Sequence, residues 1–285
     1  MRLLTGILDP TSGEGSVYGK DIVKEAETLK DNIAYMSQRF GLYEDLTVME
    51  NINFYADLFG VSGPERPEKI EKLLGFSNLT PFKARLAGKL SGGMKQKLGL
   101  ACSLVHTPKV LFLDEPTLGL DAQTRRHIWE YIRKLNKDAG VTIILTTHYM
   151  EEADFLCGRI AIMDHGKFVA QDSPSRLKDT LGGDVVSLEL EGDAAAFLDA
   201  LGRQDWIKRS KFHEDVLLLT MEKAERRIPE LVMLAQQMGV TVNCVHLRKP
   251  SLEDVFLHFT GRTIREQEAN LSERNRAMMM AHGRR

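Results

Sequence analysis

An unbroken apolar run that ends in two adjacent carboxylates constrains the fold of this chain more than any other feature. Residues 110–113 read VLFL, and Asp114 and Glu115 follow directly. A short run without a polar interruption is typical of a parallel strand that is buried on both faces. In open sheets of parallel strands, ligands bind beyond the carboxyl ends of the strands. The pattern therefore predicts a covered α/β sheet with both carboxylates at its binding edge.

The elements around this strand alternate between helix and strand. Residues 33–36 and 141–147 are predicted strands, and a helical stripe between positions 128 and 135 separates the strand at 110–113 from the one at 141–147. This alternation predicts βαβ units and a parallel sheet. Thr47 and Glu50 form a capping-box pattern, which predicts a helix from residue 48 onward.

The first residues and the second half of the chain give a different pattern. Residues 1–8 are predicted as an opening helix, and a hairpin is predicted around residues 164–167. Beyond the glycine pair at 182–183 the pattern becomes βαββαβ, which suggests a small ferredoxin-like α+β unit. We therefore expect an α/β domain over 1–181, an accessory α+β domain over 182–261 and a disordered polar tail over 262–285.

Composition excludes several classes of protein. The chain has 285 residues and a net charge of −2, so it has no global attraction to nucleic acid or anionic lipid. Its apolar runs are too short to span a bilayer, and no signal peptide opens it. The three cysteines are widely spaced without a CxxC pair, which favours free thiols in a reducing compartment.

Two adjacent carboxylates at the end of a buried strand can divide two tasks. Asp114 would hold Mg²⁺, which prefers oxygen ligands and keeps part of its water shell. Glu115 would orient and deprotonate an attacking water. The simpler interpretation is a charged helix cap after a strand. The continuation PTLGLD over residues 116–121 argues against it.

Three further segments contain candidate ligand contacts. Ser91, Gly92 and Gly93 stand at a predicted helix start, where glycines and free backbone N–H groups suit a phosphate. His148 ends the strand at 141–147 and could sense a γ-phosphate, while Gln38 ends an earlier strand and could bind the metal or the attacking water. A capped Gly-containing loop, a structural histidine and a surface amide are the simpler alternatives.

These segments occur in one order: Gln38, LSGG, VLFLDEPTLGLD and TTHYMEEAD. In this order the chain resembles the nucleotide-binding subunit of an ABC transporter. More narrowly it is similar to the ABC-2 type drug-export group, which includes the daunorubicin-resistance ATP-binding proteins. The segments that carry the narrower resemblance are LTGILDPTSGEG, LTVMENI, LSGGMKQKL and PSLEDVFL, and the resemblance extends from Met1 to about Arg262.

The resemblance implies an ATPase that uses ATP and Mg²⁺ and works as a head-to-tail dimer. Asp114, Glu115, Gln38 and His148 would serve this chain's own nucleotide, with Asp114 and Gln38 at the metal. Ser91, Gly92 and Gly93 would contact the nucleotide of the second subunit, and Asp121 would lie at the dimer interface. A separate integral membrane permease would complete the exporter, which places this chain in the cytoplasm on the inner face of the membrane. Residues 39–43 and the helix from 48 match the region that binds the permease.

One expected motif is absent. No GxxxxGK[ST] string, the phosphate-binding loop of such ATPases, occurs between Met1 and Arg285. Relatives carry this loop, two strands and an adenine-stacking aromatic residue before the position of Met1. We therefore expect that the printed sequence is truncated at its N-terminus and does not hydrolyse ATP alone.

Two alternatives stay open at this point. The chain could be a non-catalytic partner that lends its LSGG surface to a complete ATPase, although Glu115 and His148 argue against this. It could also be a soluble ABC ATPase that acts on DNA or ribosomes, but it has neither heptads nor a tandem cassette. We therefore expect no nucleic-acid partner. Nothing in the sequence identifies the cargo.

Overall fold

The computed structural model describes residues 1–38, 41–192, 194–213 and 216–261. These residues form two compact units: unit 1 is Met1–Glu152, and unit 2 begins at Ala153. The domain boundary predicted at residues 181 and 182 lies within unit 2 and stays a prediction. The predicted tail over 262–285 lies outside the described residues. None of the described helices is long and apolar enough to cross a bilayer.

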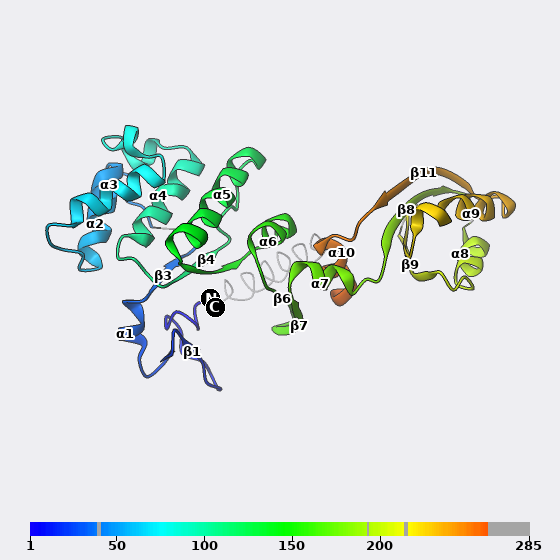
Figure 1. Ribbon diagram of the computed structural model, residues 1–285, viewed down its shortest axis with the longest axis horizontal. Helices are drawn as coiled ribbons and strands as arrows, with labels where there is room; N and C mark the ends of the chain where they lie inside the picture. Colours follow the sequence, from blue (N-terminus) through cyan, green and yellow to red (C-terminus); the bar gives the residue numbers. More distant parts are fainter. Residues whose placement is uncertain (39–40, 193, 214–215, 262–285) are drawn as a thin grey trace, which may run out of the picture. The chain divides into compact units, whose positions relative to one another are not determined.

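A three-stranded parallel sheet organises unit 1 (Figure 1). Its order is β3 (Ile33–Met36), β4 (Val110–Asp114) and β5 (Thr142–Thr146), with β4 in the centre. The side chains of residues 111–113 are fully buried, which confirms the parallel strand predicted from the VLFL run. The outer strand β5 is partly exposed along its length.

Three helices form a separate group with its own core in unit 1. They are α2 (Val48–Leu58), α3 (Arg66–Phe76) and α4 (Gly92–Leu104), accompanied by short 3-10 helices at Thr80–Phe82 and Ala87–Lys89. Thr47 and Glu50 form the predicted capping box at the start of α2, which satisfies two backbone N–H groups. The buried faces of the three helices pack into one apolar cluster.

Helix α5 (Ala122–Ala139) follows the carboxylates and begins at the cap residue Asp121. The predicted apolar stripe is confirmed, because Ile128, Trp129, Ile132 and Leu135 are all buried. Gly140 ends the helix in the left-handed conformation that glycine adopts without strain. Helix α6 (Met150–Leu156) begins shortly after β5.

The predicted opening helix over residues 1–8 is wrong, because these residues form turns. The hydroxyl of Thr5 hydrogen-bonds to the carbonyl of Arg2 at 3.2 Å. Gly6 has φ +66°, and a Cβ there would lie 3.1 Å from the Cβ of Ala26. The chain thus bends at Gly6 beside α1 (Ala26–Lys30), and a left-handed residue cannot continue a right-handed helix. A small hairpin, β1 (Ser16–Val17) with β2 (Lys20–Asp21), follows this turn.

Unit 2 opens with the predicted hairpin, β6 (Ile160–Asp164) and β7 (Lys167–Asp172), followed by α7 (Pro174–Asp179). The predicted βαββαβ order is confirmed. Its elements are β8 (Asp184–Glu191), α8 (Ala195–Leu201), β9 (Ile207–His213), β10 (Val216–Met221), α9 (Ala224–Gln237) and β11 (Thr241–Arg248). Helix α10 (Leu252–Thr260) ends the described chain.

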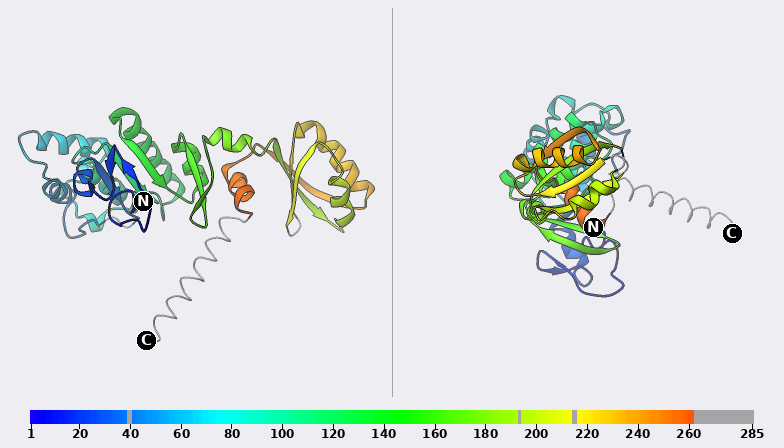
Figure 2. Two further views of the ribbon diagram at one scale, coloured as in Figure 1. Left: turned by 90° about the horizontal axis from the view of Figure 1, so that it is seen from below. Right: turned by 90° about the vertical axis from the view of Figure 1, so that its right-hand side faces the viewer.

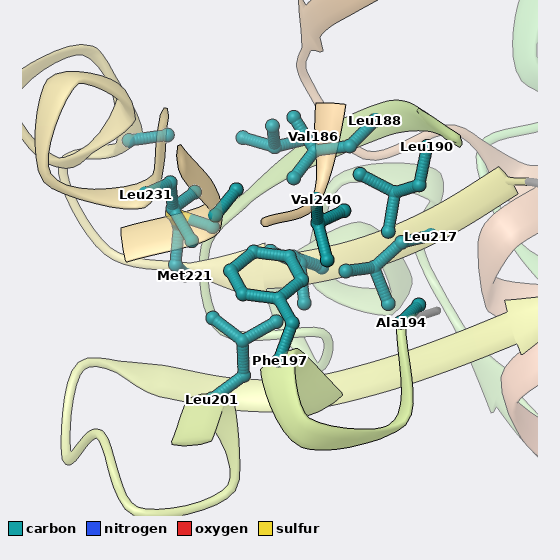
Figure 3. Close-up of a cluster of buried hydrophobic side chains, with 13 residues drawn as sticks. Val186, Leu188, Leu190, Ala194, Phe197, Leu201, Leu217, Met221, Leu231 and Val240 are labelled. Carbon is teal, nitrogen blue, oxygen red and sulfur yellow. The ribbon is translucent and has the colours of Figure 1, made fainter. Parts of the chain in front are cut away.

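The second sheet has the order β11-β8-β10-β9 and is antiparallel throughout, as a ferredoxin-like unit requires (Figure 2). Helices α8 and α9 contribute to the same apolar cluster as the inward residues of β8 and β10, so both helices cover one face of the sheet. Phe197 lies fully buried in this cluster, near Leu201 and Val240 (Figure 3).

Candidate functional site

The last residue of β4 is held from both neighbouring strands. Asp114 Oδ1 accepts a hydrogen bond from Thr146 Oγ1 at 2.5 Å, and Asp114 Oδ2 accepts one from Tyr35 Oη at 3.1 Å. Burial and the adjacent carboxylate raise the pKa of Tyr35, so its phenol stays a donor to Asp114. Neither Tyr35 nor Thr146 was predicted from the sequence. Together they fix the orientation of the Asp114 carboxylate at the edge of the sheet.

Glu115 and His148 contact each other directly. His148 Nδ1 lies 2.8 Å from Glu115 Oε2, and the two side chains are 28% and 23% exposed. The backbone of Glu115 has φ +52°, which is uncommon for a residue other than glycine. Its N–H donates to the carbonyl of Thr146 at 3.1 Å, and its own carbonyl accepts from Leu118 N–H at 3.2 Å. We call residues 115–120, which turn away from the sheet here, the Glu115 turn.

Burial raises the pKa of Glu115, and His148 partly opposes this effect. The nearby carboxylate of Glu152 adds to the rise, because two like charges disfavour each other. A carboxylate with a raised pKa is a stronger base than an exposed glutamate. Glu115 therefore has the environment that a general base requires.

The predicted site residue Gln38 lies two residues beyond β3, at the same end of the sheet as Asp114. Its side chain is exposed. Within the described residues, no hydrogen bond joins Gln38 to Asp114 or Glu115. The topology therefore places Gln38 at the correct edge, and its role at the metal stays a prediction.

The start of α4 packs against the start of α5. Gly93 is buried, and a Cβ added to it would lie 2.2 Å from Thr124 Cγ2. Ser91 and Asp121 cap the two helices: Ser91 Oγ accepts from Met94 N–H at 3.4 Å, and Asp121 Oδ1 accepts from Thr124 N–H at 2.9 Å. Both cap residues are exposed, so the two helix starts form one accessible surface.

A second contact joins this surface to the Glu115 turn. The amide nitrogen of Gln96, in the first turns of α4, donates to the carbonyl of Pro116. Gly92 is exposed, and a Cβ there would lie 3.3 Å from Leu120 Cδ2. The predicted site residues thus form two neighbouring groups in unit 1. One group surrounds Asp114, and the other lies at the starts of α4 and α5.

Comparison with known proteins identifies the family. The family model for ABC transporters matches residues 1–118. The chain is 34% identical to the linearmycin resistance ATP-binding protein LnrL of Bacillus subtilis, over 93% of this chain and 86% of that protein. The chain belongs to the ABC transporter ATP-binding proteins. The predicted resemblance to the ABC-2 drug-resistance group is confirmed. It rests also on 35% identity to the daunorubicin/doxorubicin resistance protein DrrA of Streptomyces peucetius, over 92% of this chain and 79% of DrrA.

A further relative is longer than this chain. The probable multidrug ABC transporter ATP-binding protein YbhF of Escherichia coli is 49% identical to this chain over 64% of the chain's residues. The matched segment spans 31% of the length of YbhF.

Solved structures confirm the α/β fold of an ABC ATPase. CbiO1 from Clostridium perfringens, part of the ABC transporter complex cbiONQ, has a TM-score of 0.57 at 27% identity, over 63% of this chain and 74% of CbiO1. The ATP-binding cassette MJ0796, solved as a dimer in a post-hydrolysis state with ADP and Pi, has a TM-score of 0.53 at 26% identity, over 60% of this chain and 78% of MJ0796.

The Asp114 carboxylate of this ABC protein suits the Mg²⁺ that its family implies. Asp114 offers two carboxylate oxygens, each with a lone pair beyond the one that Tyr35 or Thr146 occupies. In the described part of the chain, no group of three or more His, Cys, Asp or Glu side chains could enclose a metal ion. The single carboxylate of Asp114 fits Mg²⁺, which takes one carboxylate and completes its shell with water and phosphate oxygens.

We expect Gly93→Ala to destabilise unit 1 by about 1–3 kcal/mol, because the added methyl group overlaps Thr124 Cγ2. The double variant Gly93→Ala/Thr124→Ser removes that methyl group of Thr124 and should regain most of the loss. The measurement is urea unfolding followed by Trp129 fluorescence in a Trp206→Phe background, with Thr124→Ser alone as the control. Equal stability of the Gly93→Ala variant and the parent would contradict the packing described here.

We also expect the stability of unit 1 to depend on pH through Glu115. A carboxyl whose pKa is raised by folding favours the protonated native state, so its contribution is complete below the ordinary value of 4.5 and is lost as pH rises through the raised pKa. The loss should be on the order of 1 kcal/mol between about pH 4.5 and neutrality, and it should be absent in Glu115→Gln. Urea unfolding at several pH values measures it, with the exposed Glu151→Gln as the control. Parallel pH curves for the parent and Glu115→Gln would refute it.

Proposed function

We propose that this chain is the ATP-hydrolysing subunit of an ABC-type export system that drives a separate membrane permease. The contact between Glu115 and His148 carries the proposal. It places a carboxylate with a raised pKa and an imidazole 2.8 Å apart, directly after the strand that presents Asp114. An ATPase needs a group to accept a proton from water and a group to contact the departing phosphate, and this pair supplies both.

In the proposed reaction each residue has one task. Glu115 orients the attacking water and accepts its proton at Oε1 or Oε2. His148 keeps Glu115 in place through Nδ1 and would contact the γ-phosphate through its imidazole ring. Asp114, fixed by Tyr35 and Thr146, holds Mg²⁺, and Gln38 contributes at the same edge of the sheet. Mg²⁺, when bound, neutralises the charge that develops on the phosphate oxygens.

The second group of residues acts on the nucleotide of a partner subunit. Ser91, Gly92 and Gly93 offer the exposed N-terminus of a 13-residue helix, where backbone N–H groups favour a phosphate. Asp121 caps the adjacent helix and lies at the proposed dimer interface. The dimeric form of the similar cassette MJ0796 supports pairing of two such subunits, for which we propose a head-to-tail arrangement.

An aromatic patch on α2 is the proposed docking surface for the permease. It comprises Tyr43, Phe54, Leu58 and Phe59, which are 48%, 37%, 65% and 38% exposed. The rings of Tyr43 and Phe54 meet edge to face at 4.5 Å. Buried Asn51 fixes the segment before α2, because its amide donates to the carbonyl of Tyr43 at 3.0 Å. A rigid exposed patch of this composition is typical of a protein interface.

Docking at this patch would hold the chain at the inner face of the cell membrane as a peripheral subunit. Several relatives carry names of resistance to drugs such as linearmycin and daunorubicin. We therefore propose export of small organic molecules, with selectivity set by the permease. A non-catalytic role, in which this chain lends the exposed start of α4 to a complete ATPase, is the second candidate.

We expect the chain with the printed sequence to show no ATPase activity above background, because the backbone nest and lysine of a phosphate loop are missing. Adding a designed N-terminal strand that ends in GxxxxGK[ST] should produce turnover. Glu115→Gln should remove that turnover by a factor of at least about one hundred. Phosphate release measures it, and Glu151→Gln is the control. Absence of turnover in the extended chain would favour the non-catalytic role, whereas turnover that survives Glu115→Gln would rule out Glu115 as the catalytic base.

A substitution that introduces a charge into the patch tests the proposed docking surface. Leu58→Asp places a carboxylate at the most exposed residue of the patch, and we expect it to weaken binding to the permease at least about tenfold. The measurement is the amount of integral membrane protein that co-purifies with each variant. Met233→Asp, at a residue of unit 2 that is 57% exposed, is the matched control. Unchanged co-purification of the Leu58→Asp variant would place the interface elsewhere.

A further inference from the structure

Glu152 on α6 is a fully buried carboxylate. Its Oε1 accepts hydrogen bonds from Thr117 Oγ1 at 2.8 Å and from Trp129 Nε1 at 2.7 Å. Its Oε2 is also buried and has no hydrogen-bond partner within the described residues. An unsatisfied buried oxygen costs about 1–3 kcal/mol, so stability alone does not account for a glutamate here.

The Oε1 atom of Glu152 connects three segments of unit 1. Thr117 belongs to the Glu115 turn and is itself fully buried. Trp129 lies on the buried face of α5. Glu152 follows His148 in the chain, and its backbone N–H donates to the carbonyl of Tyr149 at 3.1 Å. Glu152 therefore joins the segment that carries Glu115 to the segment that carries His148.

The Glu115 turn needs such an attachment. Glu115 has φ +52°, a conformation that costs a residue other than glycine on the order of 1–3 kcal/mol and persists only where surrounding contacts impose it. One end of the turn is held by the hydrogen bond from Glu115 N–H to the carbonyl of Thr146. Within the turn, Thr117 is the residue whose side chain reaches a buried carboxylate.

We propose that Glu152 is a positioning residue that holds the Glu115 turn against the segment of His148 and so maintains the contact between Glu115 and His148. The proposal rests on the roles of that pair in the proposed function. Its mechanism is the hydrogen bond from Thr117, with Trp129 fixing the carboxylate from the other side. A glutamine has an amide oxygen at the same place, so it should perform the same task, whereas alanine should not.

The ring signal of His148 tests the proposal without measuring turnover. The full chain, labelled at histidine with ¹⁵N, is compared as the parent, Glu152→Ala, Glu152→Gln and the exposed control Glu151→Ala. His148→Gln assigns the signal, and Glu115→Ala shows its position once the contact is lost. We expect Glu152→Ala to move the His148 signal most of the way to that position. Glu152→Gln and Glu151→Ala should leave it near the parent.

Hydrogen exchange of the backbone amides over residues 115–120 provides the second measurement. It should become at least about tenfold faster in Glu152→Ala and stay near the parent rate in Glu152→Gln. Thr117→Val removes the donor while keeping the volume of the side chain, and it should move the His148 signal in the same direction. This variant decides the question where Glu152→Ala does not fold.

The proposal is overturned by either of two results. The His148 signal could stay at its parental position in Glu152→Ala or, failing folding, in Thr117→Val, which would make Glu152 a packing residue. It could also move as far in Glu152→Gln as in Glu152→Ala, which would assign the effect to charge. A failure of Glu115 as the catalytic base would appear in the phosphate-release assay and would leave these contact measurements unchanged.

Discussion

The parallel alignment of β4 between β3 and β5 is the constraint on which the rest of the site depends. The register pairs Asp114 with Thr146, and it places Tyr35 of β3 within hydrogen-bond distance of the same carboxylate. Because three parallel strands end at one edge, the residues that follow them gather there too. Burial of residues 110–113 fixes that edge, since a slip of the strand by one residue would carry charged Lys109 or Asp114 into the buried layer.

Local patterns explain what the sequence predicts well. The apolar run of β4, the capping box of Thr47 and the βαββαβ order are all set by neighbouring residues. The prediction of an opening helix failed because Gly6 takes a left-handed conformation beside Ala26. Local patterns do not reveal this packing. Tyr35 was missed for a different reason. Strand alternation gives the face on which it lies, but its partner is 79 positions away in the chain.

Contacts between separate helices are similarly hidden from sequence patterns. Glu152 reads as one of two glutamates at the start of a short helix, and the sequence does not separate it from exposed Glu151. The difference appears only when α5 brings Trp129 beside it. The two glycines of LSGG are likewise not distinguished by the sequence, although Gly92 is exposed and Gly93 is buried. The proposed phosphate-binding role would account for exposed Gly92, whereas packing requires a glycine at position 93 because Thr124 occupies the space of a side chain.

A chain of direct contacts connects the aromatic patch to Asp114 at the edge of the sheet. Phe59 stacks on the imidazole of His106 with ring centroids 4.1 Å apart, and His106 Nε2 donates to the carbonyl of Ile33 at 2.9 Å. Burial lowers the pKa of His106, which keeps the ring neutral with its single proton on that nitrogen. Ile33 begins β3, and Tyr35 on the same strand holds Asp114. In the proposed function, a permease segment that displaced Phe59 would therefore act on the strand that carries Tyr35, and through Tyr35 on the orientation of Asp114.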